Sequence, residues 1–192
     1  MRPLPTTKDE WRSHLTVARR AVPPEVRTAE ADALASAALP LVAPGQTVCA
    51  YVPVGAEPGS RQLLDSLRAL DVHVLLPVVV GRKPLDWAEY DGNLVRGPHN
   101  LLEPTGRRLG AEAVGAASLI LVPALAVDAT GVRLGRGAGH YDRSLVYADQ
   151  GTQLVAVVRD QEFLPELPAD PHDIRMTAAL TPGRGKIDLG NP

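Results

Sequence analysis

The stretch SLILVPALAVD, residues 118–128, is one of the two longest apolar runs in the chain. A continuous apolar run predicts a strand that is buried on both faces, as in a parallel sheet covered by helices. The segments TVCAYVPV (47–54), HVLLPVVV (73–80) and QLVAVVR (153–159) have the same character. Segments with helical spacing alternate with these strands. We therefore expect an α/β protein, a single three-layer α/β/α domain with a mainly parallel, open, Rossmann-like sheet.

Helices are expected between these strands. A first helix should begin after Thr6 or Thr7 and end before Pro23, and two more should cover residues 25–39 and 60–70. Each start is marked by a capping residue or by proline, and each stop by proline or by the beginning of the next strand. The spacing of these helices supports alternation of strand and helix along the chain.

Two segments depart from this alternation. PLDWAEY (84–90) and NLVRG (93–97) predict two short strands joined by the turn DGN, a short antiparallel excursion near 85–97. The end of the chain, GRGKIDLGNP, is polar and rich in Gly and Pro. We expect a domain of residues 1–182 followed by a flexible tail, residues 183–192.

Composition excludes several classes of function. The net charge of −2 and the pI near 6.2 give no basic surface for nucleic acid, so we expect no nucleic-acid partner. The longest apolar runs, about ten residues, are half of what a membrane crossing needs. The first residues lack the apolar core of a secretory signal. We expect a soluble, cytoplasmic monomer whose single cysteine, Cys49, lies buried in a strand.

A glycine-rich loop, RLGRGAGHYDR (133–143), follows the apolar run. Glycines at every second position let backbone N–H groups approach an anion closely, and a helix starting near Gly139 would add partial positive charge. Arg133, Arg136 and Arg143 suit phosphate oxygens. Asp142 among them requires a cation, which Mg²⁺ would supply. Spacing alone leaves open a tight connection without a ligand.

At this point the residues resemble a known family, the 5-formyltetrahydrofolate cyclo-ligases. Their signature is roughly an apolar strand, then x-x-G-x-R-L-G-x-G-x-G-Y-Y-D-R, and residues 119–145 of this chain follow it. The resemblance extends to Lys8 with Arg12, and spans about residues 6–180. Further matching segments are YVPVGAEPGSRQLLDSL (51–67), LDWAEY (85–90), GPHNLLEP (97–104) and LPADPHDI (167–174).

The resemblance implies an ATP- and Mg²⁺-dependent cyclisation of 5-formyltetrahydrofolate to 5,10-methenyltetrahydrofolate, with release of ADP and phosphate. The γ-phosphoryl group activates the formyl oxygen, and N10 of the folate then attacks the formyl carbon. A site for this chemistry needs mainly positioning and neutralisation of charge. Glycine amides, arginines and Mg²⁺ can provide both.

The same resemblance assigns the site residues. The ATP contacts are Lys8, Arg12, Arg133, Leu134, Gly135, Arg136, Gly137, Ala138, Gly139, His140 and Tyr141. The folate contacts are Val52, Glu57, Arg136, Gly137, Ala138, Gly139 and His140. The Mg²⁺ ligands are Asp142 and Asp173, and the catalytic residues are Arg136 and Tyr141.

The chain also departs from the family pattern. His140 stands where the first tyrosine of Y-Y-D is usual, and Ala138 stands where a glycine is common. Val127 replaces a phenylalanine, and Thr177 replaces an aspartate. These departures keep open a nucleotide- and folate-binding regulatory homologue with little turnover. A sugar-phosphate or acyl-transfer enzyme on a similar sheet is a further alternative.

Several other side chains have a plainer interpretation. Trp87 and Tyr90 are expected to pack in the core, and Arg19 and Arg20 to be solvated or to bind the negative tail of the substrate. Glu103 is expected to orient either the glycine loop or the substrate. Without the resemblance, a solvated helix face is the favoured interpretation of Lys8 and Arg12, and Glu57 could equally be a surface carboxylate or a folate contact.

Overall fold

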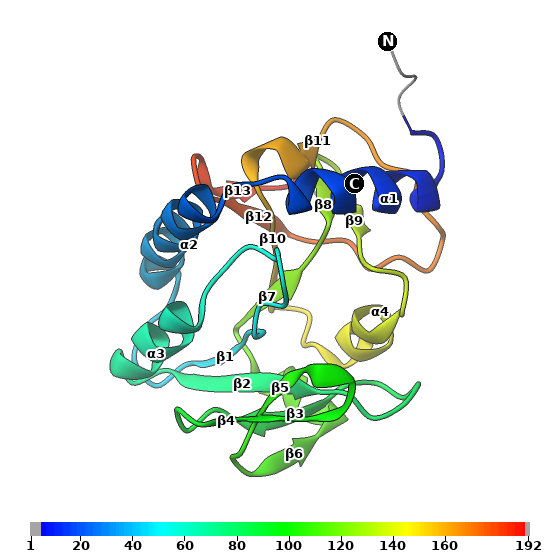
Figure 1. Ribbon diagram of the computed structural model, residues 1–192. Helices are drawn as coiled ribbons and strands as arrows, with labels where there is room; N and C mark the ends of the chain where they lie inside the picture. Colours follow the sequence, from blue (N-terminus) through cyan, green and yellow to red (C-terminus); the bar gives the residue numbers. More distant parts are fainter. Residues whose placement is uncertain (1–4, 191–192) are drawn as a thin grey trace.

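The computed structural model describes residues 5–190, which build a sheet covered on both faces (Figure 1). The central sheet has eight strands in the order β13-β12-β10-β7-β1-β2-β3-β6. The strands β12, β10, β7, β1 and β2 are parallel, which confirms the expected fold class. The bounds are β1 (Thr47–Cys49), β2 (His73–Val78), β3 (Asp86–Glu89), β6 (Arg108–Gly110), β7 (Leu119–Pro123), β10 (Gln153–Val157), β12 (Ala178–Thr181) and β13 (Gly185–Asp188).

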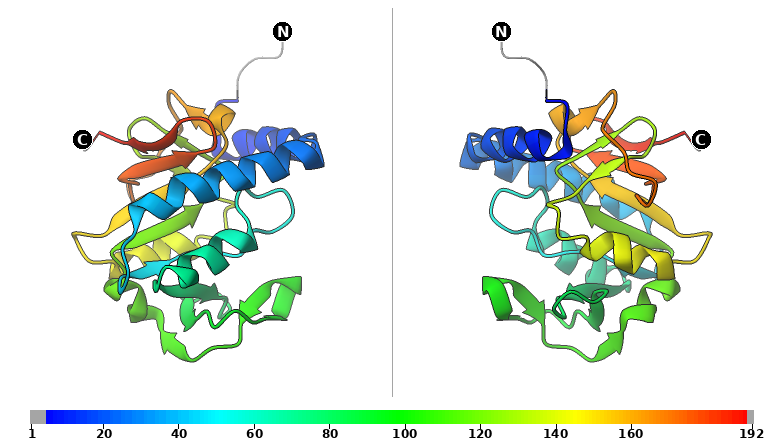
Figure 2. Two further views of the ribbon diagram at one scale, coloured as in Figure 1. Left: turned by 90° about the vertical axis from the view of Figure 1, so that its left-hand side faces the viewer. Right: turned by 90° about the vertical axis from the view of Figure 1, so that its right-hand side faces the viewer.

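Helices α2 and α3 cover one face of the sheet, and α4 lies on the other face (Figure 2). The short 3₁₀ turns η3 and η4 complete the second layer. The helices are α1 (Lys8–Arg20), α2 (Pro24–Ala38), α3 (Arg61–Ala69) and α4 (His140–Ser144). The 3₁₀ turns are η1 (Leu39–Leu41), η2 (Pro98–Asn100), η3 (Ala111–Ala116), η4 (Leu145–Tyr147) and η5 (Asp160–Glu162).

Strand β7 shows why the run 118–128 is apolar without interruption. Leu119 and Leu121 pack in the cluster under α2 and α3, while Ile120 and Val122 pack in the cluster under η3 and η4. All four side chains are at most 2% exposed. Because both faces are covered, alternation of apolar and polar residues would place polar groups in the core.

Helix α1 begins where the sequence predicts. The Thr7 hydroxyl accepts a hydrogen bond from the N–H of Glu10, and the Glu10 carboxylate accepts one from the N–H of Thr7. This capping box satisfies two free backbone donors of the first turn. Leu15 then packs α1 against a small three-stranded sheet at one end of the molecule. That sheet has the order β11-β8-β9 and contains β8 (Ala126–Asp128), β9 (Arg133–Leu134) and β11 (Phe163–Leu164).

The β8–β9 hairpin stands between β7 and the glycine loop, so the loop does not follow β7 directly. Asp128, 1% exposed, holds this hairpin: its carboxylate accepts hydrogen bonds from Thr130, Val132 and the N–H of Leu167. A buried carboxylate with four such donors is a structural group. It fixes the start of β9, from which the glycine loop departs.

We expect Gly131→Ala to lower the free energy of unfolding by at least about 2 kcal/mol. Gly131 has φ +86°, and a Cβ there would lie 2.4 Å from the Met176 carbonyl oxygen. Neither the left-handed backbone nor that backbone contact can relax cheaply. Urea unfolding measures the change. Gly151→Ala, where a Cβ meets nothing within 4 Å, is the control and should be nearly neutral; equal losses at both positions would contradict this account.

One expectation about strand pairing is wrong. Residues 94–96 do form β4 (Leu94–Arg96), but β4 pairs with β5 (Leu102–Pro104) and not with β3. The buried strand β3 instead extends the central sheet between β2 and β6. The expected antiparallel excursion is present, since β3 runs antiparallel to β2. Strand β4 is mostly exposed and forms a separate ribbon.

The tail expected to be flexible after residue 182 instead forms β13, which pairs antiparallel with β12. Ile187 in that strand packs against the core cluster of the second layer. Two apolar side chains, Ile187 and Leu189, and a ladder of backbone hydrogen bonds thus outweigh the polar, glycine-rich composition. Residues 191 and 192 lie outside the described part of the chain.

Cys49, Trp87 and Tyr90 are buried, as the sequence predicts. Cys49 and Trp87 are fully buried, and the Tyr90 hydroxyl donates to Asp65 within the packing. Burial raises the pKa of the Cys49 thiol, which makes it unreactive. Among residues 5–190, no helix is long and apolar enough to span a membrane.

Candidate active site

A pocket of about 340 Å³ lies where β1, β2 and β7 end at their carboxyl side. Tyr51 follows β1, Val79 follows β2 and Ala124 follows β7, and all three line the pocket. This edge of a parallel sheet is where ligands bind in open α/β folds. Every site residue assigned from the sequence lines it: Lys8, Arg12, Val52, Glu57, Arg133, Leu134, Gly135, Arg136, Gly137, Ala138, Gly139, His140, Tyr141, Asp142 and Asp173.

The glycine loop is held by two guanidinium groups. Arg12 Nε donates to the Gly135 carbonyl oxygen at 3.0 Å, and Arg143 Nη2 donates to the Ala138 carbonyl oxygen at 2.9 Å. Gly137 and Gly139 have φ of +99° and +69°, which other residues rarely adopt. Among the described residues, no acceptor bonds the N–H groups of 137–139, so these donors are available to an anion.

Helix α4, which follows this loop, is shorter than the sequence suggests. It covers only five residues before the chain continues as a 3₁₀ turn. The macrodipole of so short a helix contributes little, so the predicted helix charge is a minor part of the site. Backbone N–H groups and arginines carry the positive potential.

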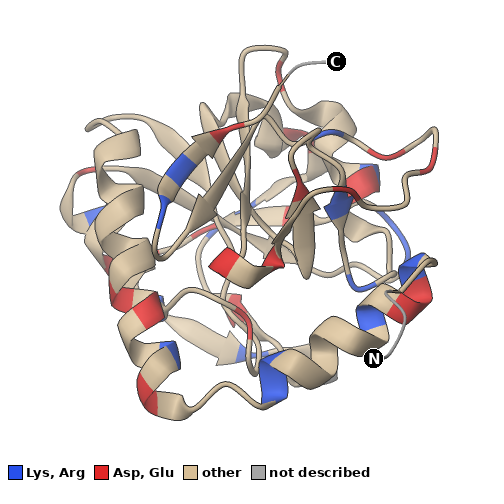
Figure 3. Ribbon diagram, turned by 90° about the horizontal axis from the view of Figure 1, so that it is seen from above, with Lys and Arg blue, Asp and Glu red and all other residues tan. Residues whose placement is uncertain are grey.

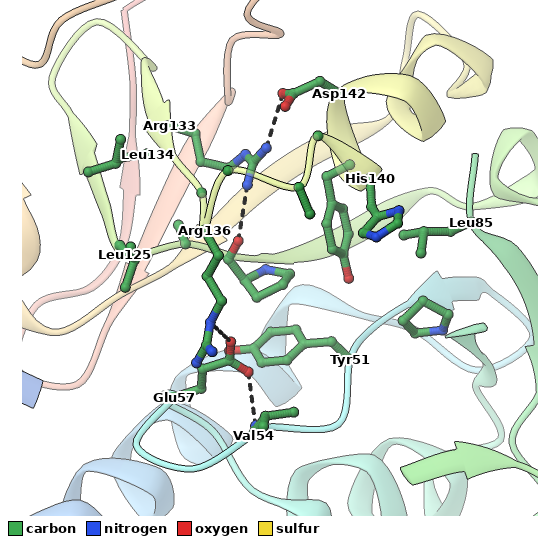
Figure 4. A pocket seen from close by; sticks show the side chains of 18 of the residues that line it. Tyr51, Val54, Glu57, Leu85, Leu125, Arg133, Leu134, Arg136, His140 and Asp142 are labelled. Atoms are coloured by element: carbon green, nitrogen blue, oxygen red, sulfur yellow. Dashed lines mark hydrogen bonds and ion pairs between the residues drawn. The ribbon is translucent and has the colours of Figure 1, made fainter. Parts of the chain in front are cut away.

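Asp142 is paired with an arginine of the chain itself. Arg133 Nη2 lies 3.0 Å from Asp142 Oδ1, and the two are shown joined in Figure 4. The Arg133 guanidinium also stacks over the ring of Tyr141 at 5.7 Å and donates to the Pro123 carbonyl oxygen. Arg133 is 8% exposed. The Arg133–Asp142 pair thus holds the two ends of the glycine loop together.

The Tyr141 hydroxyl is buried and has no hydrogen-bond partner among the described residues. Burial first, and then the negative charge of Glu57, raise the pKa of this phenol above its ordinary value of about 10. Tyr141 therefore offers an un-ionised O–H donor beside the pocket. A buried donor without an acceptor is expected to find one in a ligand.

Glu57 and Arg136 form a second ion pair on the opposite wall. Glu57 Oε1 lies 3.0 Å from Arg136 Nε, and Glu57 also accepts a hydrogen bond from the Val54 N–H (Figure 4). The Glu57 side chain is 10% exposed, whereas that of Arg136 is 59% exposed. Among the described residues, Nε is the one atom of the Arg136 guanidinium that has a partner. Its two terminal nitrogens are therefore open to an anionic group in the pocket.

Asp173 contacts a cation as well, the ammonium group of Lys8. Lys8 Nζ lies 2.7 Å from Asp173 and 2.6 Å from Asp170. Burial opposes the charged form of Lys8, but these two hydrogen bonds outweigh it and raise its pKa. For Asp173, burial acts to raise the pKa. Hydrogen bonds from the Asp170 N–H and from the Lys8 ammonium group outweigh it, so the pKa is lowered. Asp170, His172 and Asp173 carry ligand-type atoms within 4.8 Å of one another.

A sequence model of the 5-formyltetrahydrofolate cyclo-ligase family matches residues 5–182. The chain belongs to this family. The 5-formyltetrahydrofolate cyclo-ligase of Mycolicibacterium smegmatis is 51% identical over 191 residues, covering 96% of this chain and 98% of that protein. The protein of the same name from Escherichia coli K12 is 27% identical over 173 residues, covering 86% and 95%.

Solved structures agree with this assignment. The 5,10-methenyltetrahydrofolate synthetase of Aquifex aeolicus matches with a TM-score of 0.81 and 26% identity, over 96% of this chain and 94% of that one. The synthetase of Mycoplasma pneumoniae matches with a TM-score of 0.73 at 15% identity, over 91% and 98%, and supports the fold. The chain thus matches cyclo-ligase enzymes over more than nine tenths of their length.

The structure adds pocket residues to those read from the sequence of this family member. Arg19, expected to be solvated or to bind the negative tail of the substrate, is 4% exposed and paired with Glu162, because α1 packs it against the chain beyond β7. Tyr51 and Asp170 lie within two segments that match the family, 51–67 and 167–174, but neither was assigned to the site from the sequence. Glu103 lines the pocket with one carboxylate oxygen unpaired among the described residues.

Two departures from the family signature are explained by local contacts. The Thr177 hydroxyl accepts from the N–H of Leu154, and it lies within hydrogen-bond distance of the Leu154 carbonyl oxygen. Val127 is fully buried in the second core cluster. Both residues serve the sheet and neither lines the pocket.

The pH response of His140 is a testable property of this site. Burial first, and then the nearby Arg143, lower the pKa of His140 below its ordinary value of about 6.5. At pH values between the lowered pKa of the folded protein and the ordinary pKa of the unfolded chain, the unfolded chain binds the proton more tightly. The free energy of unfolding therefore rises with pH across that interval. In metal-free protein we expect an NMR titration midpoint below 6.5.

Arg143→Gln should move that midpoint part of the way back, because the effect of burial remains. A midpoint at or above the ordinary value in the unaltered protein would contradict the structure. The His140 ring is then neutral at physiological pH and acts as a hydrogen-bonding group, as a tyrosine would.

Proposed function

We propose that this chain catalyses the ATP- and Mg²⁺-dependent cyclisation of 5-formyltetrahydrofolate to 5,10-methenyltetrahydrofolate, releasing ADP and phosphate. One observation carries the proposal: residues from α1, the loop after β1, the glycine loop and the 170–173 loop all line one pocket. These are the segments that the family resemblance assigns to ATP, folate and metal. The names of the relatives give the reaction class.

The proposed chemistry has two stages. The formyl oxygen attacks the γ-phosphorus of ATP, an O–P bond forms, and the bond to ADP breaks. The N10 lone pair then attacks the activated formyl carbon. The carbon–oxygen bond breaks, phosphate departs, and N10 releases its proton to leave the 5,10-methenyl cation. Phosphorylation is needed because a formamide oxygen is a poor leaving group.

Residues of this chain position the groups and neutralise the charge. The free N–H groups of 137–139 and the guanidinium of Arg133 face the phosphates. Arg136 is placed to contact the transferring phosphoryl group with its unpaired terminal nitrogens. The Tyr141 hydroxyl donates to an oxygen of the ligand. The Glu57 carboxylate accepts hydrogen bonds from the amino and ring N–H groups of the pterin.

The donor set fits a divalent cation in kind. Asp142, Asp170 and Asp173 present carboxylate oxygens to the pocket, and these are the ligands that Mg²⁺ prefers. Each of these carboxylates already has a cationic partner, Arg133 or Lys8, within 3.0 Å. We propose that Asp142 and Asp173 hold Mg²⁺ and that Arg133 and Lys8 then face the phosphates. Bound Mg²⁺ supplies positive charge to the β- and γ-phosphates.

We also propose that the enzyme acts as a monomer in the cytoplasm. The residues proposed to contact ATP, folate and metal lie together in a single pocket. Size-exclusion chromatography with light scattering tests the oligomeric state.

The function is tested by incubating the purified protein with 5-formyltetrahydrofolate, Mg²⁺ and ATP. Formation of the methenyl product is followed by its near-ultraviolet absorbance. We expect turnover that requires all three components. Binding of nucleotide and folate without product would refute the enzymatic proposal and favour a regulatory protein.

Asp142→Ala tests the metal assignment in the same assay and should abolish turnover at low Mg²⁺. Asp32→Ala, on the exposed face of α2 and away from the pocket, is the matched control and should keep full activity. An unchanged rate for Asp142→Ala would remove Asp142 from the metal site.

A further inference from the structure

A buried cluster of four charged side chains joins α1, η5 and α2. Arg19 of α1 pairs with Glu162 of η5 at 2.6 Å. Arg159, the residue before η5, pairs with Glu30 of α2 at 2.7 Å and lies 3.7 Å from Glu162. The two arginines and Glu162 have side chains at most 6% exposed. Seen from above, η5 lies between α1 and α2 (Figure 3). Two positive and two negative charges balance within this cluster, as buried charges require.

Arg159 also reaches out of the cluster, to the loop that follows β1. Its Nη1 donates a hydrogen bond to the Ala56 carbonyl oxygen at 3.0 Å. Among the described residues, this is the one hydrogen bond that this oxygen accepts. Ala56 directly precedes Glu57, the carboxylate proposed to bind the pterin. Arg159 does not itself line the pocket of the candidate active site.

The peptide group between Ala56 and Glu57 is thereby held at both ends. Its carbonyl accepts from Arg159, and its N–H donates to the Val54 carbonyl oxygen at 3.2 Å. A peptide group is planar, so two fixed ends fix the orientation of the whole plane. That orientation sets the direction in which the Glu57 side chain leaves the backbone. Rotation of the plane would move the Glu57 carboxylate away from the pocket position it now holds.

Apolar packing does not hold the tip of this loop. Val54 and Gly55 are exposed. The Tyr51 hydroxyl, from within the same segment, donates to the Pro58 carbonyl oxygen at 2.6 Å. Within residues 5–190, Arg159 is the one residue outside 51–58 that hydrogen-bonds to the backbone of 54–58. The conformation at Glu57 therefore depends on this single guanidinium group from a distant segment.

We propose that Arg159 is a positioning residue that sets the affinity for folate through Glu57. The inference rests on the proposed function, in which the Glu57 carboxylate accepts hydrogen bonds from the pterin. Glu30 and Glu162 hold the guanidinium, and the guanidinium holds the Ala56–Glu57 peptide. A carboxylate that is ordered before the ligand arrives loses less conformational freedom when it binds.

The competing role is purely structural, with Arg159 tying α2 to the end of β10 and leaving the loop unaffected. Both roles predict an effect on stability, so stability does not separate them. Only positioning predicts a selective loss of folate affinity.

The test variant is Arg159→Met/Glu30→Met, which leaves the balanced pair of Arg19 and Glu162 in place. Replacing a buried ion pair with apolar side chains of similar volume often leaves stability unchanged, and urea unfolding verifies that the variant is folded. We expect the folate KM, and the folate Kd from equilibrium titration without ATP, to rise about tenfold, as for the loss of one charge-assisted hydrogen bond. The values of kcat and of the KM for ATP should stay within about twofold, because the lost contact serves ground state and transition state alike.

A double-mutant cycle shows whether Arg159 acts through Glu57. In the Glu57→Ala background, the same two substitutions should cause no further rise in the folate Kd, since no carboxylate is left to position. A further tenfold rise there would overturn the inference. Lys186→Met/Asp188→Met removes an ion pair of β13 that lines no part of the pocket, and this control should keep the wild-type folate Kd.

Amide hydrogen exchange at the Glu57 N–H tests the positioning without any ligand. We expect exchange at least about tenfold faster in Arg159→Met/Glu30→Met than in the wild type, because the peptide plane is no longer held at its carbonyl. An unchanged exchange rate or an unchanged folate Kd would overturn the inference, even where turnover upholds the proposed function. A wild type that binds folate without turnover refutes the proposed function alone, and the Kd then still tests Arg159. A wild type that binds no folate refutes both.

Discussion

Replacing Arg136 with alanine is expected to lower kcat about 100- to 1,000-fold, the effect typical of removing one charge-stabilising donor from a transition state. Arg136 projects from the glycine loop into the pocket, and within residues 5–190 only its Nε has a partner, Glu57 at 3.0 Å. Its terminal nitrogens are free to follow charge as it develops on a transferring phosphoryl group. The measurement is steady-state kinetics with saturating ATP and folate.

The Glu57→Gln variant separates two roles of this arginine. If Arg136 only held Glu57 in place for the folate, both variants would raise the KM for folate and leave kcat unchanged. We expect a fall in kcat for Arg136→Ala and a rise in the folate KM for Glu57→Gln. An Arg136→Ala enzyme with unaltered kcat would remove this residue from the chemistry.

Replacing Arg19 with methionine is expected to lower the free energy of unfolding by about 3–5 kcal/mol, the cost of removing one partner from a buried ion pair. Arg19 and Glu162 have side chains only 5% and 6% exposed, and two guanidinium nitrogens contact the carboxylate at 2.6 and 2.7 Å. Methionine fills similar volume but leaves Glu162 with only Arg159 beside it. Urea unfolding of the full chain measures the change.

The neighbouring residue provides the control. Arg20 is exposed and has no carboxylate partner among the described residues, so Arg20→Met should change stability by no more than about 0.5 kcal/mol. Equal effects at the two adjacent arginines would show that the Arg19–Glu162 pair does not hold α1 to the rest of the fold.

Arg19 and Arg20 also show what the sequence alone does not predict. Arg19 and Arg20 are chemically identical neighbours on a helix, and the sequence predicts both as solvated or bound to the substrate tail. Which of them is buried depends on the angle at which α1 packs on β8 and β9. That angle is fixed by Leu15 and its partners from distant segments, Leu125 and Val132.

Local signals explain the expectations that were confirmed. The capping box at Thr7 and the uninterrupted apolar run in β7 each depend on residues close together in the chain. The partner of each short strand was not predictable from its composition. The segment 94–96 pairs with 102–104, and residues 185–188 turn back on 178–181, because each pairing satisfies backbone donors and acceptors of both strands.

By itself, the sequence determined the fold class, the family and the segments that carry the chemistry, because each depends on patterns within short stretches. The tertiary structure alone decided which charges meet. It paired Asp142 with Arg133, Asp173 with Lys8 and Glu57 with Arg136. It also gathered five arginines around a second cavity. The physical reason is that electrostatic attraction depends on distance in space, and only folding sets the distance between residues far apart in the chain.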